Sequence, residues 1–174
     1  VSSKFGKLIA GSLSNVKNMG VEFGVATIKS SSNVDATFKF SKVDIANLGG
    51  KNKIKLEFCD ATKIVLDNSL TALNLNESYS TVNIKPGNIS ASYTISTSFG
   101  SVIDRSNAGI KRTDTPDKYG PDSNKTYEGK SGSGAAKIDI KSSFGKIIVG
   151  EATEDDMKDK KDKTKNKAKK DKVV

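Results

Sequence analysis

Apolar and polar residues alternate with a period of two along most of residues 1–150. This is the period of a β-strand, and no apolar stripe persists at the helical spacing of three and four residues. Val, Ile, Thr, Ser and Asn dominate this part of the chain, and the β-branched residues among them favour strands. The pattern therefore predicts an all-β domain over residues 1–150 and excludes a helical protein.

The alternation is organised in units that share an aromatic residue followed by a small one. Successive pairs lie 18, 17, 18, 21, 20 and 45 residues apart. The last interval fits one repeat of about 18 residues plus an insertion of about 27, so the chain has an internal repeat. We number the seven units in chain order by their pairs, which are Phe5-Gly6, Phe23-Gly24, Phe40-Ser41, Phe58-Cys59, Tyr79-Ser80, Phe99-Gly100 and Phe144-Gly145.

The residues around each pair repeat as well. The fourth residue before the aromatic residue and the third residue after it are apolar in every unit. The fifth residue after it is polar only at Lys63 and Asp104. Near Lys63, a one-residue slip of the kind found in a β-bulge would turn Ile64 and Leu66 inward instead. We expect the aromatic residue to face inward with these columns, and the chain to turn a corner at the small residue.

Each unit therefore consists of a strand, a corner, a second strand and a polar turn, and it is too short to bury its own apolar face. Units stacked along one axis can do so, each adding about 4.8 Å of sheet spacing. The sequence predicts a single-domain β-solenoid, or β-helix, of about seven rungs over residues 1–150. An antiparallel sandwich or barrel is the alternative, because it also has short strands at regular intervals.

Composition limits the chemistry that this domain can perform. The chain has one cysteine and no histidine, which excludes an internal disulfide, a zinc site and a cysteine–histidine pair. We therefore expect no catalytic, cofactor-binding or metal-binding residues. No run of about 18 apolar residues is present, so no transmembrane segment is expected. The chain opens within a repeat at Val1, which suggests that an export signal has been removed.

The net charge of +9 also bears on partners. A basic surface can bind nucleic acid, anionic membranes or acidic glycans. Lysines at exposed strand positions also protect a sheet from aggregation, and here they are interspersed along the repeat. We expect no specific nucleic-acid partner and regard a surface glycan or another envelope protein as the partner class.

Two segments depart from the repeat. Residues 105–134 are rich in Gly, Asp, Ser and Thr, which predicts one long inserted loop. Residues 151–174 are Lys-rich and charged without a core-forming pattern, which predicts a disordered C-terminal tail. The loop is either a solvated flap or a ligand-binding surface of aromatic and cationic side chains. The residues that would form that surface are Lys111, Arg112, Lys118, Tyr119, Lys125, Tyr127 and Lys130.

The aromatic–small corner followed by alternating aliphatic residues resembles a bacterial adhesin-like family of unknown function, in the group described as autotransporter-adhesin-like head domains. The passages that carry the resemblance are SSFGKIIVG (142–150), SKFGKLIAG (3–11), FKFSKVDI (38–45), ESYSTVNI (77–84) and YEGKSGSGAAKIDIKSSFGKI (127–147). The resemblance covers residues 1–150 and implies a β-solenoid exported to the envelope or surface of Gram-negative bacteria. It supplies no catalytic residues.

We therefore expect a non-enzymatic protein of the cell envelope or surface that acts as an adhesin or binding scaffold. Two alternatives stay open, a polysaccharide-acting enzyme of the parallel β-helix type and a purely structural spacer. Such an enzyme needs carboxylates that converge on one exposed face. The outward acidic residues Asp35, Asp44, Glu57 and Asp139 are instead scattered along the chain.

Overall fold

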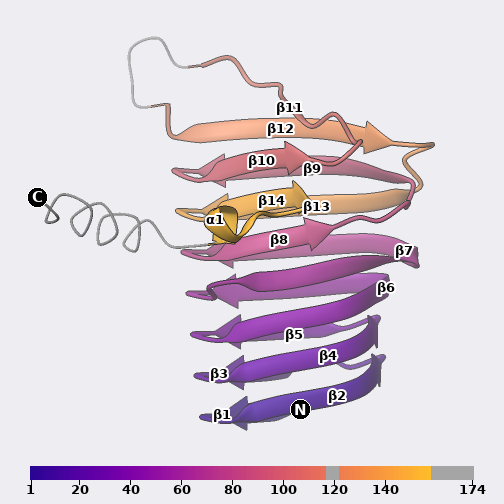
Figure 1. Ribbon diagram of the computed structural model, residues 1–174, viewed down its shortest axis with the longest axis vertical. Helices are drawn as coiled ribbons and strands as arrows, with labels where there is room; N and C mark the ends of the chain where they lie inside the picture. Colours follow the sequence, from indigo (N-terminus) through magenta and orange to yellow (C-terminus); the bar gives the residue numbers. More distant parts are fainter. Residues whose placement is uncertain (117–121, 158–174) are drawn as a thin grey trace, which may run out of the picture.

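The computed structural model describes residues 1–116 and 122–157. These residues form an all-β structure with one short helix, which confirms the prediction of an all-β domain. All fourteen strands belong to one large, mixed sheet. Its strands lie above one another in an elongated stack, with the N-terminus at one end (Figure 1).

Parallel strands form two stacks within this sheet. The first stack contains the strands before each aromatic residue, and the second contains the strands after it. β6 (Lys42–Glu57) and β7 (Thr62–Ser78) pass from the second stack to the first and so join the two. The other strands of the first stack are β1 (Ser2–Lys4), β3 (Met19–Glu22), β5 (Asp35–Lys39), β9 (Ala91–Ser98) and β13 (Ala136–Ser143). The other strands of the second stack are β2 (Lys7–Ser14), β4 (Val25–Ser32), β8 (Thr81–Lys85), β10 (Ser101–Arg105) and β14 (Lys146–Gly150).

The order of the units in space differs from their order in the chain. β13 of unit seven pairs in parallel with β7 of unit five on one side and with β9 of unit six on the other. In the second stack, β14 likewise lies between β8 and β10. Ile140 is consequently level with Leu75 and with Ile95. Unit seven, the last in the chain, is therefore inserted between units five and six.

The segment predicted as one long loop contains two strands. β12 (Asn124–Ser131) pairs antiparallel with β9 over eight residues, and β11 (Lys111–Arg112) pairs antiparallel with β12. Ala108 and Ile110 are buried against the end of the core. The loop prediction is therefore wrong for these residues. The segment covers the end of the stack, where the backbone of β9 and the core of unit six would otherwise be exposed.

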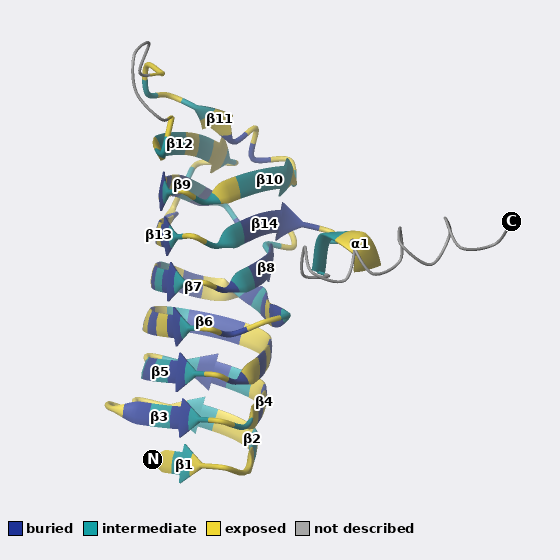
Figure 2. Ribbon diagram, turned by 90° about the vertical axis from the view of Figure 1, so that its left-hand side faces the viewer, coloured by how far each residue is buried: buried dark blue, intermediate teal, exposed yellow. Residues whose placement is uncertain are grey.

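The core lies between the two stacks and is continuous along them, as the buried positions in Figure 2 show. The slip predicted near Lys63 is present, because Ile64 and Leu66 are buried and Lys63 is exposed. Cys59 is also buried, as a small residue at the corner. The apolar positions that recur at every second residue of the sequence therefore form the interior.

The chain continues past Gly150 along the outside of the second stack. Lys85 forms an ion pair with Glu151 at 2.6 Å, and Arg105 forms one with Asp156 at 2.8 Å. Residues 154–157 form the helix α1 (Glu154–Met157), which lies beside β14 (Figure 2). The part of the predicted tail at residues 151–157 is thus held against the sheet. Residues 158–174 lie outside the described residues, and their predicted disorder stays a prediction.

Over the described part of the chain, no helix is long and apolar enough to cross a membrane.

Candidate binding surface

The aromatic residues of the seven units face solvent, which corrects the prediction that they point inward. Each has a left-handed backbone conformation, with φ between 47° and 57°. This conformation is uncommon for a residue with a large side chain, and it directs the ring away from the interior at the corner. The small residue that follows lies on the interior side instead, in the same alternation as the apolar residues two and four positions later. The corner therefore includes both residues of the pair.

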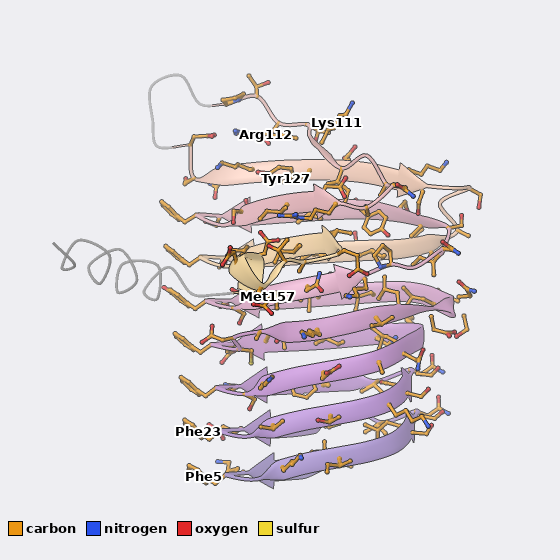
Figure 3. All side chains as sticks on the ribbon, in the orientation of Figure 1. Phe5, Phe23, Lys111, Arg112, Tyr127 and Met157 are labelled. Atoms are coloured by element: carbon orange, nitrogen blue, oxygen red, sulfur yellow. The ribbon has the colours of Figure 1, made fainter. Side chains whose placement is uncertain are left out.

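The seven rings form one continuous column, which we call the aromatic column. Neighbouring rings are parallel within 5° and their centroids are 4.8–5.1 Å apart. The exposed fractions of these residues run from 45% to 79%. The ring faces contact one another, so mainly the ring edges meet solvent at the margin of the stack (Figure 3). From the N-terminal end, the column contains Phe5, Phe23, Phe40, Phe58, Tyr79, Phe144 and Phe99.

The small residues behind the rings hold the corners together. A Cβ atom on Gly24 would lie 2.2 Å from the carbonyl oxygen of Gly6, so the two backbones can approach closely only because Gly24 has no side chain. The Ser41 hydroxyl accepts a hydrogen bond from the Gly24 N–H and donates one to the Lys39 carbonyl. Ser80 makes the same two kinds of bond, with the Cys59 N–H and the Ser78 carbonyl. The backbone beneath the aromatic column is therefore fixed by hydrogen bonds at successive corners.

A groove with a volume of about 440 Å³ runs beside the column where units four to seven meet. Four rings form its apolar side. Its polar side carries hydroxyl groups, one carboxylate and one ammonium group, and Lys146 Nζ also donates a hydrogen bond to the carbonyl of Asp156 at 2.7 Å. The rings belong to Phe58, Tyr79, Phe144 and Phe99, and the polar groups to Asp60, Ser80, Thr81, Ser101 and Lys146.

A buried carboxyl group lies directly behind this groove. Glu77 is 3% exposed; its carboxyl accepts hydrogen bonds from the Ser142 hydroxyl and from the backbone N–H of Ser80. Burial raises the pKa of Glu77 to about 7, although both hydrogen bonds act in the opposite direction. Gly145 leaves the space that the carboxyl occupies, since a Cβ atom there would overlap it. Glu77 and Ser142 stand at the same position of their units, two residues before the ring, where units two to four have apolar residues.

The structure places five of the predicted loop residues on the two strands at the end of the stack, where Figure 3 labels Lys111, Arg112 and Tyr127. Lys111 and Arg112 are on β11, and Lys125, Tyr127 and Lys130 are on β12. In the register of these strands, Arg112 is opposite Tyr127. Lys118 and Tyr119 lie outside the described residues.

Three of these five side chains have partners within the protein: Arg112, Tyr127 and Lys125, whose ammonium group lies 3.9 Å from the Asp122 carboxylate. The Arg112 guanidinium donates hydrogen bonds to Asp114 and Asp122. The hydrogen bonds from Arg112 lower the pKa of Asp114 to about 2, and the pKa of Arg112 is raised, first by its bond to Asp122. Tyr127 packs against the core, and burial raises the pKa of its hydroxyl. The positive charge of Arg112 is thus balanced internally, whereas Lys111 is exposed.

Sequence reasoning missed the exposed column, although one signal could have indicated it. The small residue of each pair lies an even number of positions before the apolar residues that follow it, so it faces the interior with them. Its aromatic neighbour therefore faces outward. The polar residues Glu77 and Ser142 at an interior position were a second signal. Within residues 1–116 and 122–157, no three His, Cys, Asp or Glu side chains gather in a way that could hold a metal ion.

Comparisons of the chain with protein-family models, with curated proteins and with solved structures find no match.

Proposed function

We propose that the seven units form a β-solenoid that serves as a non-enzymatic binding scaffold of the bacterial cell envelope or surface. Two stacks of parallel strands in register and one column of stacked rings support the solenoid. The resemblance to adhesin-like head domains supports the location and the binding role. The aromatic column and its groove are the recognition surface in this proposal.

The groove beside the four rings is the observation that carries the binding role. A sugar has apolar C–H groups, which pack on aromatic side chains, and hydroxyl groups, which exchange hydrogen bonds with polar side chains. Thr81, Ser101 and Asp60 supply such polar groups next to the rings. The ligand class is therefore a surface glycan.

The hydrolytic alternative is less well supported by the same geometry. Hydrolysis of a glycosidic bond needs a pair of carboxyl groups that reach the substrate from two sides. Asp60 is the carboxylate among the residues that line the groove. Glu77 is nearby, but its carboxyl is buried and bonded to Ser142 and Ser80. These contacts give Glu77 a structural role between units five and seven.

A glycan-array screen of the purified protein, followed by calorimetry on the best ligand, tests the proposal. Ser101→Trp fills the groove with a large side chain and should weaken binding at least tenfold. Lys42→Trp is the matched control, because Lys42 has the same position in unit three, away from the groove. Thermal melting of both variants checks that they are folded. Equal binding by the two variants would show that the glycan binds outside the groove. If no glycan binds, a purely structural role as a spacer would be favoured.

A further inference from the structure

The side chains that border the aromatic column change in chemistry along the stack. The residue directly before each ring is charged in units one to four, where Lys4 forms an ion pair with Glu22 at 3.1 Å. Lys39 likewise pairs with Glu57 at 2.9 Å. In units five, seven and six this residue is a serine, and the three serines lie in register as Ser78, Ser143 and Ser98. The border of the column thus changes from ion pairs to hydroxyl groups at unit five.

At these three levels, hollows lined by hydroxyl groups lie on both sides of the column. On the side of the second stack is the groove beside the rings, where Lys146 is in register with Thr81 and with Ser101. On the side of the first stack, a second hollow of about 300 Å³ has Ser143 and Ser98 in its lining. A ligand that lies over the ring edges can therefore exchange hydrogen bonds with the protein on both sides.

Positive charge also flanks the column here. Lys146 lines the groove on one side of the Phe144 ring, and the exposed Lys141 lines the second hollow on the other side. The ring faces contact other rings, so a ligand meets the ring edges, which are the positive part of the aromatic quadrupole. Asp60, the carboxylate of the groove, belongs to unit four and lies outside these three levels. The local potential therefore favours a ligand with negative charge.

The spacing of the levels restricts the shape of the ligand. The ring centroid of Phe144 is 5.0 Å from that of Tyr79 and 5.0 Å from that of Phe99. In an extended β-1,4-linked glycan the rise per sugar is close to this spacing, so successive sugars can occupy successive levels. Successive sugars of such a chain also face opposite ways. Carboxylates at C6 therefore point alternately toward the two sides of the column, where the two lysines stand.

We propose that the three-ring site, formed by Tyr79, Phe144, Phe99 and the two hollows beside them, binds a linear acidic β-1,4-linked glycan with one sugar at each level. This inference rests on the proposed glycan-binding function and narrows its ligand class. Oxygen atoms of the chain contact the ring edges, and its hydroxyl groups bond to the serine and threonine side chains of the borders. The carboxylates pair with Lys141 and Lys146.

Three tetrasaccharides test charge and spacing separately. β-1,4-linked mannuronate carries a carboxylate on every sugar of an extended chain. β-1,4-linked mannose has the same linkage without the carboxylates, and α-1,4-linked guluronate has the same charge in a buckled chain with a shorter rise. Calorimetry at low salt and without calcium should give mannuronate a dissociation constant about tenfold lower than that of either control. Added salt should reduce its advantage over mannose, because salt screens charges at a surface.

Single lysine variants test where the charge acts. Lys141→Gln and Lys146→Gln should each weaken mannuronate binding by about fivefold, the upper range for an exposed ion pair. Lys137→Gln is the matched control, because it removes the same charge from an exposed position of β13 that lines neither hollow. This control should bind mannuronate like the unmodified protein. Thermal melting checks that all three variants are folded.

The outcomes separate this ligand class from glycan binding in general. Equal affinities for mannuronate and mannose would overturn the role of charge, and equal affinities for mannuronate and guluronate would overturn the match in spacing. In both cases glycan binding itself would stand. Equal weakening by Lys137→Gln and Lys141→Gln would overturn the site, since net charge alone would then attract the glycan. Absence of mannuronate binding would overturn the ligand class, and the glycan-array screen would then decide separately whether the protein binds other glycans.

Discussion

The hydroxyl of Ser142 donates a hydrogen bond to the carboxyl of Glu77, a residue 65 positions earlier in the chain. This bond joins unit seven to unit five inside the core. Burial favours the neutral carboxyl at this position, because among the residues that the structure describes no charged group is bonded to it. The contact therefore links the stability of the inserted unit to pH.

We expect the protein to lose stability as the pH rises through the range in which Glu77 ionises. Its pKa is raised from 4.5 to about 7 by folding, so the folded state binds more protons than the unfolded state between these values. The contribution of Glu77 to the free energy of unfolding is then greatest below about pH 4.5. It falls by up to roughly 3 kcal/mol as the pH rises to about 7. Chemical denaturation at a series of pH values measures this change.

The variant Glu77→Gln should remove this part of the pH dependence, because an amide does not ionise. Glu57→Gln is a suitable control, since hydrogen bonds from Lys55 and Lys39 lower the pKa of Glu57. That control should retain the loss of stability between pH 4.5 and 7. An unchanged pH profile in Glu77→Gln would show that another group is responsible.

The corner glycine Gly100 should tolerate no larger side chain. A Cβ atom on Gly100 would lie 2.8 Å from the Ser142 hydroxyl and 3.1 Å from the Gly145 carbonyl. We expect Gly100→Val to destabilise the fold by about 2–4 kcal/mol through overpacking between units six and seven. Gly20→Val is the control, because nothing lies within 4 Å of a Cβ atom at Gly20. Equal melting temperatures for the two variants would contradict the close approach at this corner.

Removing a ring from within the aromatic column should cost more than removing the ring at its end. Phe40 stacks on two neighbours, Phe23 and Phe58, whereas Phe5 stacks on one. We expect Phe40→Ala to be more destabilising than Phe5→Ala by about 1 kcal/mol, the value of one aromatic pair. Urea denaturation of the two variants gives the difference. A larger loss in Phe5→Ala would mean that the stacking contributes little.

Replacing residues 107–131 by a short Gly-Ser link should now lower the melting temperature and promote aggregation. A long inserted loop could be removed without loss of the fold, but this replacement removes β12 and the buried Ala108 and Ile110. The edge of β9 would then be free to pair with other molecules. A control protein with Lys111→Ser, at an exposed position of β11, keeps both strands and should melt like the unmodified protein. A shortened protein without β12 that remains equally stable would show that β12 does not protect this end.

The regular part of the fold could be predicted because each residue of the repeat makes similar contacts in successive units. Apolar positions two residues apart must face a shared interior. Even the one-residue slip that buries Ile64 in place of Lys63 could be predicted from the sequence. The strand β12 was not predicted, because it lies at the end of the stack between β9 and the two-residue strand β11 and carries mostly polar residues. Its neighbours in the sequence have the composition of a loop.

The position of unit seven and the candidate groove could not be predicted for a different reason. Both depend on contacts between distant residues, and units with the same pattern can stack in more than one order. Glu77 faces Ser142 only because unit seven occupies the level above unit five. The outward rings depend on a backbone conformation at the corner that is unusual for Phe and Tyr, so their types alone suggested a buried position.

The insertion of unit seven has a consequence for the synthesis of the protein. Proteins emerge from the ribosome from the N-terminus, and early segments can fold before later ones are made. Units one to five can stack in that order. β9 and β12 can pair with each other, but they join the stack of the earlier units only when residues 136–150 are available to lie between β7 and β9. A nascent chain that stops before residue 136 therefore carries a completed first part and an unattached second part. β9 and the strands paired with it can therefore reach their final places in the stack only after residues 136–150 have been made.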